Sequence, residues 1–124
     1  MPGTMLKTSK DLLDDTVRRC IDECVRCHEV CLSTVPYSLD QGGAHAGRAH
    51  ITLLLDCANM CQTSADFMLR GSEEHARTCA VCAAICRRCA DDCDRFTGDD
   101  VMHACAETCR RCAESCEQMA HAHM

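Results

Sequence analysis

Fifteen cysteines recur along the 124-residue chain, mostly at alternating steps of three and four residues, and this spacing limits the possible folds more than any other feature. Steps of three and four keep side chains on one stripe of an α-helix, as the a and d positions of a heptad do. The chain is therefore predicted to form helices whose thiols share one face. The cysteines fall into four groups: Cys20, Cys24, Cys27 and Cys31; Cys57 and Cys61; Cys79, Cys82, Cys86, Cys89 and Cys93; and Cys105, Cys109, Cys112 and Cys116.

Glycine and proline separate four helical segments, expected at about residues 10–35, 44–70, 72–96 and 99–122. Thr8 or Ser9 is expected to cap the first helix, with Pro36 just past its end. Gly71 suits the position after the second helix, and Ser72 suits the cap of the third. Short connections make consecutive helices antiparallel. The sequence therefore predicts that the whole chain is one all-α domain, an antiparallel up-down-up-down four-helix bundle with a cysteine-lined core.

Charged residues occupy positions between the cysteines, as Arg87, Arg88 and Asp91 do in the third segment. The polar face is therefore expected outside the bundle and the cysteine face inside. A buried cysteine can act simply as a small hydrophobe. In a chain with two Phe, one Tyr and no Trp, however, cysteine takes nearly every core position of three helices, where Leu or Ile would pack better. We therefore predict that the thiols bind metal.

The net charge of −6 argues against nucleic-acid binding, which requires a basic face. No apolar run reaches the length of a signal peptide or of a membrane span. We therefore expect a cytoplasmic protein that does not contact a membrane. Thiols stay reduced in the cytosol, so many cysteines in one chain favour a metal site over disulfides.

The charge of the bound metal separates the candidate ions. A Zn²⁺ site with four thiolates carries two negative charges, and several such sites stacked in a dry core would repel one another. If each Cu⁺ takes two thiolates and each thiolate bridges two Cu⁺, the array stays near neutral. Thiolates also select Cu(I) by their softness. The sequence thus predicts a non-enzymatic store of many Cu(I) ions, on the order of one per cysteine.

Two other classes of function remain open from the residues alone. Four Cys-x-x-Cys pairs occur, and Cys24-Val25-Arg26-Cys27-His28 matches the attachment motif for c-type haem. One alternative is a redox or electron-transfer protein that carries haem or an iron–sulfur cluster. The other is a structural zinc-binding protein.

The same steps continue past the cysteines and predict what lies at each end of the bundle. One end is expected to gather Cys31, His50, Cys93, Phe96 and Met102, with His103 beside them. The other end is expected to gather Leu13, Val17, Met68, His75 and Met119. Thioether and imidazole suit transient capture of Cu(I), so His50 and Met102 are predicted to be ligands or entry residues. A surface position is expected for four histidines: His28, His45, His121 and His123.

The ladders of the third and fourth segments, with Leu55-Asp56-Cys57-Ala58-x2-Cys61, resemble those of the bacterial copper storage proteins, and the lack of a signal peptide resembles the cytosolic branch. The resemblance implies a four-helix bundle, usually a homotetramer, whose lumen binds many Cu(I) ions. It makes all fifteen cysteines metal sites and places His50 and His103 near one mouth. Copper donor or acceptor proteins would be partners. The chain has fewer cysteines than typical cytosolic members, and His50 and Met102 stand where a cysteine could continue the ladder.

Overall fold

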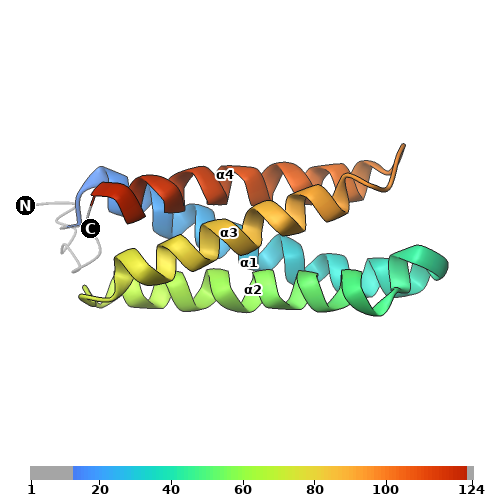
Figure 1. Cartoon of the computed structure of the whole chain (residues 1–124), viewed down its shortest axis with the longest axis horizontal. Coiled ribbons are helices and arrows are strands. Elements are labelled where there is room, and N and C mark those ends of the chain that lie inside the picture. The colour runs from blue at the N-terminus through green and yellow to red at the C-terminus, as the bar shows by residue number, and fades with distance from the viewer. Residues whose placement is uncertain (1–12, 123–124) are drawn as a thin grey trace, which may run out of the picture.

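The computed structural model describes residues 13–122, which form four α-helices and one short 3₁₀-helix. The elements are α1 (Asp15–Gln41), η2 (Gly43–Ala46), α2 (Arg48–Leu69), α3 (His75–Cys93) and α4 (Asp100–Ala122). Consecutive α-helices run in opposite directions, and α4 packs against α1 as well as α3 (Figure 1). The predicted antiparallel four-helix bundle is therefore confirmed. None of these described helices has an apolar run long enough to cross a membrane.

The connections divide between the two ends of the bundle (Figure 1). The end that we call the polar end contains η2 and the loop between α3 and α4. The end that we call the apolar end contains the start of α1, the turn between α2 and α3, and the last turn of α4. Every helix therefore runs from one end to the other, and a stripe of side chains along it spans the length of the bundle.

Helix α1 differs most from the prediction, because it runs through Pro36 to Gln41 instead of ending at residue 35. Pro36 is exposed, so the carbonyl that loses its backbone partner at this step can face water. The helix also begins later than expected: Asp14 caps it, and its Oδ1 accepts the Val17 N–H at 3.0 Å. The expected caps Thr8 and Ser9 lie outside the described residues.

The turn between α2 and α3 follows the predicted glycine. Gly71 adopts φ +64° and donates its N–H to the Met68 carbonyl, while Ser72 donates to the Phe67 carbonyl at 2.9 Å. This is a Schellman ending, which favours glycine at the left-handed position. Ser72 does not cap α3 directly: its Oγ accepts the Glu74 N–H, and the helix begins only at His75.

The remaining helix ends differ from the predicted ranges by a few residues. Helix α2 begins at Arg48 rather than residue 44, because η2 takes up the preceding turn. Helix α3 ends at Cys93 rather than residue 96. Helix α4 begins at Asp100, and the Asp99 carboxylate accepts the Met102 N–H at 3.0 Å as its cap.

All fifteen cysteines are buried, and alanines pack between them. An alanine directly follows the cysteine at Cys57, Cys82, Cys89, Cys105 and Cys112, and each of these alanines is buried as well. Small side chains beside the thiol stripe let the helix backbones approach closely. The bundle therefore has a narrow interior of sulfur atoms, with Ile21, Leu54, Phe96 and three methionines among its few large side chains.

Candidate metal site

The thiols of all four helices meet along the bundle axis. Neighbouring sulfur atoms lie 3.5 Å apart between Cys24 and Cys116 and 3.6 Å apart between Cys57 and Cys86. A disulfide requires about 2.05 Å between sulfur atoms, and all fifteen cysteines are free. These spacings instead suit sulfur atoms that share a metal ion, because a metal–sulfur bond of about 2.3 Å, the value for zinc, allows at most about 4.6 Å between two ligands.

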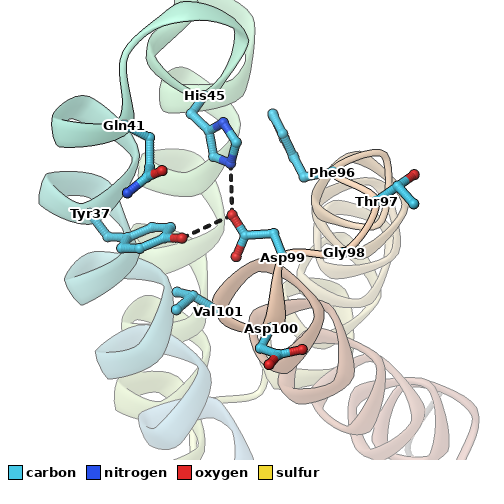
Figure 2. A pocket seen from close by; sticks show the side chains of 9 residues that line it. All are labelled: Tyr37, Gln41, His45, Phe96, Thr97, Gly98, Asp99, Asp100 and Val101. Carbon is cyan, nitrogen blue, oxygen red and sulfur yellow. Dashed lines mark hydrogen bonds and ion pairs between the residues drawn. The ribbon is translucent and has the colours of Figure 1, made fainter.

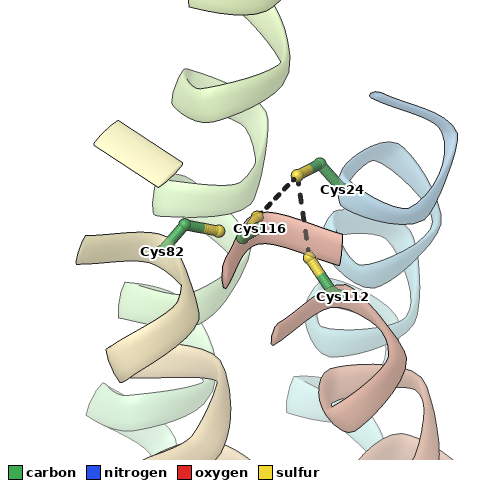
Figure 3. Close-up of side chains that lie close together, drawn as sticks. All are labelled: Cys24, Cys82, Cys112 and Cys116. Atoms are coloured by element: carbon green, nitrogen blue, oxygen red, sulfur yellow. Dashed lines mark hydrogen bonds between the residues drawn. The ribbon is translucent and has the colours of Figure 1, made fainter. Parts of the chain in front are cut away.

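Five sets of cysteines in the described residues have ligand atoms that lie within 4.8 Å of one another. Figure 3 shows one set, in which thiols from α1, α3 and α4 point toward a common centre. In order from the polar end, the sets are Cys27–Cys31–Cys57–Cys109, Cys27–Cys57–Cys61–Cys86, Cys61–Cys82–Cys86–Cys112, Cys24–Cys82–Cys112–Cys116 and Cys20–Cys79–Cys116.

Consecutive sets share members. The first and second sets share Cys27 and Cys57, and the second and third share Cys61 and Cys86. The last two sets are joined through Cys116. A thiolate that belongs to two sets can bridge two ions, so the geometry provides a continuous array rather than separate four-ligand sites. We call these twelve cysteines the thiol array.

Burial and contact with neighbouring thiols raise the pKa of some of these cysteines, which favours their protonated form in the metal-free protein. Contact with the Cys116 thiol, together with burial, raises the pKa of Cys79 to about 12. Contacts with Cys105 and Cys89, together with burial, raise the pKa of Cys93 as well. A buried thiolate without a counter-ion is costly, so a bound cation has to displace the thiol proton.

Copper affinity is therefore expected to decrease as the pH is lowered, because protons compete with Cu(I) for the sulfur atoms. Because the pKa of Cys79 is about 12, each ion that displaces one proton at neutral pH should bind about tenfold more weakly for each unit by which the pH is lowered. Competition against a Cu(I) chelator at pH 6.5, 7.0 and 7.5, corrected for protonation of the chelator, measures this slope. An affinity independent of pH would mean that the ligands are already ionised.

All three non-cysteine residues that were predicted as sites lie at the polar end. His50 and Met102 are both buried, whereas His103 is exposed on α4. Burial opposes ionisation of Asp92, but hydrogen bonds from His50 and Arg95 lower its pKa. The Asp92 side chain is therefore an ionised carboxylate and accepts the hydrogen bond, which His50 Nδ1 donates to Asp92 Oδ2 at 2.5 Å. His50 Nε2 lies 3.1 Å from Ser38 Oγ, so both ring nitrogens have a hydrogen-bond partner.

Three residues at the polar end were missed from the sequence. Thr34 and Ser38 are buried and continue the α1 stripe by steps of three and four beyond Cys31. Ser38 was missed because the helix was predicted to end at residue 35. His45 was expected at the surface but is half-buried, and its ring lies 4.1 Å from that of Phe96. It belongs to η2, outside the cysteine spacing, so no pattern in the sequence pointed to it.

An open depression of about 560 Å³ lies outside this end of the thiol stripe. In Figure 2, Tyr37 and His45 both point toward the Asp99 carboxylate: the Tyr37 hydroxyl donates at 2.9 Å, and His45 Nε2 lies at 2.8 Å. The Tyr37 hydrogen bond to Asp99 raises the pKa of Tyr37. Asp99 thus ties α1, η2 and the start of α4 together around Phe96.

Loss of the Asp92 carboxylate is expected to destabilise the metal-free protein. Asp92→Ala leaves the buried His50 Nδ1–H without its acceptor, and such a loss costs about 1–3 kcal/mol. Asp91→Ala is the matched control, because Asp91 is 81% exposed and pairs with Arg110 at 3.3 Å; surface pairs contribute about 0–1 kcal/mol. Urea unfolding under reducing conditions measures the free energy of unfolding of both variants. Equal losses would show that the contact between Asp92 and His50 adds nothing to the stability.

A four-helix bundle with a continuous array of free thiols in its core defines a metal-binding protein rather than one held by disulfides. The copper storage protein family matches residues 13–121. The chain belongs to that family, and the resemblance drawn from the cysteine ladders is confirmed.

Solved structures agree with this assignment. The protein Nmul_A1745 from Nitrosospira multiformis is 41% identical, covers 89% of this chain and 99% of its own, and superposes with a TM-score of 0.83. Cu(I)-bound BsCsp3 of Bacillus subtilis is 31% identical over 86% of this chain and 99% of its own, with a TM-score of 0.79. The Streptomyces lividans protein Ccsp, loaded with 10 copper equivalents, is 26% identical over 92% of this chain and 98% of its own, with a TM-score of 0.82.

Proposed function

We propose that this chain stores Cu(I) inside the bundle on bridging cysteine thiolates, without catalysing a reaction. The observation that carries the proposal is the sharing of cysteines between consecutive sets. Sharing lets each thiolate serve two ions, so the capacity is on the order of one Cu(I) per cysteine. The relatives support the choice of metal, since BsCsp3 is bound to Cu(I) and Ccsp carries 10 copper equivalents.

We include all fifteen cysteines among the ligands, with His50 and Met102 at the polar end. Cys89, Cys93 and Cys105 lie outside the thiol array but are buried at that end. His50 can bind an ion there if it gives up one of its two hydrogen bonds. The exposed position of His103 favours a role in capture at the surface rather than in the core.

Three further proposals concern location, assembly and partners. A cytoplasmic location is favoured by the relative from Streptomyces lividans that is described as cytosolic. A homo-oligomer, a tetramer by resemblance, is favoured by Leu32, Leu39 and Leu55, which are 44%, 53% and 38% exposed on α1 and α2. Copper donor and acceptor proteins are expected partners, because a protein that stores copper has to receive and release it.

The choice of metal is tested by anaerobic purification from cells grown with added copper, zinc and iron, followed by elemental analysis. We expect copper to exceed the other metals by at least tenfold and the protein to be colourless in visible light. One or two zinc ions per chain with little copper would favour the structural zinc alternative. Visible colour from haem or an iron–sulfur cluster would favour the electron-transfer alternative and contradict storage.

A further inference from the structure

The apolar end of the bundle contains a small cavity of about 120 Å³ next to the last set of the thiol array. Its lining is mostly apolar and includes two thioethers, and the residues are Leu13, Val17, Met68, Gly71, His75 and Met119. Met68 and Met119 are 3% and 0% exposed. The sequence prediction that these side chains gather at one end is confirmed, and Met68 contacts Cys79 of the sulfur core.

The thiol array ends here at Cys20, Cys79 and Cys116. Helix α2 contributes no further cysteine: the two steps after Cys61 are Ser64 and Met68. Both contact Cys79, whose Sγ lies 3.5 Å from Ser64 Oγ and 3.8 Å from Met68 Sδ. A hydroxyl is a hard ligand and a thioether is a soft one, so of the two only Met68 offers a ligand that Cu(I) prefers.

The spacing and the charge both fit one more ion at this position. Two sulfur ligands of a single ion lie at most about 4.6 Å apart when each bond is about 2.3 Å, the value for zinc–thiolate bonds, and Met68 Sδ and Cys79 Sγ lie 3.8 Å apart. One thiolate and one neutral thioether bound to Cu⁺ give no net charge. A neutral site suits an apolar pocket, where an unbalanced charge would be costly.

We propose that the Met68 thioether is a ligand of a terminal Cu(I) ion, which it binds together with the Cys79 thiolate at the edge of the Cys20–Cys79–Cys116 set. The proposal rests on the proposed storage function and adds a non-cysteine ligand at the end opposite His50. A thioether does not bridge as the shared thiolates do. The terminal ion is therefore held less tightly than those in the array, and it is among the last to be bound and the first to be removed by a chelator.

The first test compares Met68→Leu with Met60→Leu. Leucine replaces methionine with little change of volume, and Met60 lies on the same helix, partly buried at the edge of the core and one residue away from the cysteine stripe. We expect Met68→Leu to bind about one ion fewer than the wild-type chain in anaerobic competition with a chelator. Met60→Leu should match the wild type. Equal capacity and equal release from both variants would overturn the proposal.

The second test reads the ligand directly and does not depend on capacity. Cu(I) is diamagnetic, so the methyl resonances of ¹³C-methyl-methionine-labelled protein can be followed through a titration. The signal missing from Met68→Leu identifies Met68. We expect this signal to shift during the last equivalents bound, while the Met60 signal stays in place. A Met68 signal that does not move up to saturation would overturn the proposal whatever the copper capacity of Met68→Leu.

Met68→Cys provides a gain-of-function variant, because it places a thiol at the same step. It should retain the terminal ion and release it to the chelator at least tenfold more slowly than the wild type. Release at the wild-type rate would contradict the assignment. A wild-type chain that binds many ions without engaging Met68 overturns this inference alone, whereas a wild-type chain that binds few ions overturns the storage function and this inference with it.

Discussion

The double variant Cys57→Ala/Cys61→Ala is expected to bind about half as much copper as the wild-type chain, although it loses only two of fifteen thiols. These two cysteines, the only ones on α2, belong to three of the five sets. Their loss leaves Cys24–Cys82–Cys112–Cys116 and Cys20–Cys79–Cys116 intact. It removes one of the two cysteines shared by the first and second sets and one of the two shared by the second and third. The loss of copper capacity should therefore be larger than the removal of two thiols alone would account for.

The matched control is Cys89→Ala/Cys93→Ala, which also removes two buried thiols from one helix. Neither cysteine belongs to any of the five sets. We expect this variant to lose about two ions, in proportion to its thiols. Anaerobic titration with a chelated Cu(I) donor measures both capacities, and far-ultraviolet circular dichroism checks that each bundle is folded. Equal losses from the two variants would mean that each thiol contributes independently, which contradicts a shared array.

Copper loading is expected to raise the thermal stability of the bundle beyond the range of an ordinary domain. The metal-free core consists largely of cysteine and alanine, which bury little apolar surface per residue. A site that binds only the folded state adds about 4.1 kcal/mol when the free ligand is at 1,000 times its Kd. Several such sites together exceed the about 5–15 kcal/mol of a typical native protein.

We therefore expect the loaded protein to remain folded above about 90 °C and the metal-free protein to unfold at an ordinary temperature for a small domain. Anaerobic differential scanning calorimetry measures both forms, and removal of copper by a chelator should restore the lower transition. On copper loading, the unfolding temperature of the Cys57→Ala/Cys61→Ala variant should rise less than that of the wild type. A shift of only a few degrees on full loading would place the ions outside the core.

The fold and the cysteine core could be predicted because a helix repeats every 3.6 residues. Steps of three and four placed the cysteines on one face of each helix without knowledge of any contact between helices. The same periodicity predicted the residues around the apolar cavity, including Met68 and Met119. Gly71 was predicted as the end of α2 because a left-handed residue after a helix favours glycine.

The polar end could not be predicted in the same way, because it depends on contacts between distant parts of the chain. Pro36 reads as a helix stop, yet α1 continues for five residues to Gln41, where Ser38 contacts His50 and Tyr37 contacts Asp99. His45 and Asp99 are 54 residues apart in the sequence. Asp92 resembled the other charged residues between the cysteines, although its carboxylate accepts from a buried histidine.

The number of Cu(I) ions that one chain binds tests the central claim most directly. Metal-free, fully reduced protein is titrated anaerobically with Cu(I) in the presence of a competing chelator, and bound copper is counted against free thiols measured in the same sample. A shared array of thiolates predicts saturation on the order of one ion per cysteine, or about fifteen per chain. Saturation below about five ions per chain would contradict storage in the bundle core, because isolated four-thiolate sites would account for it.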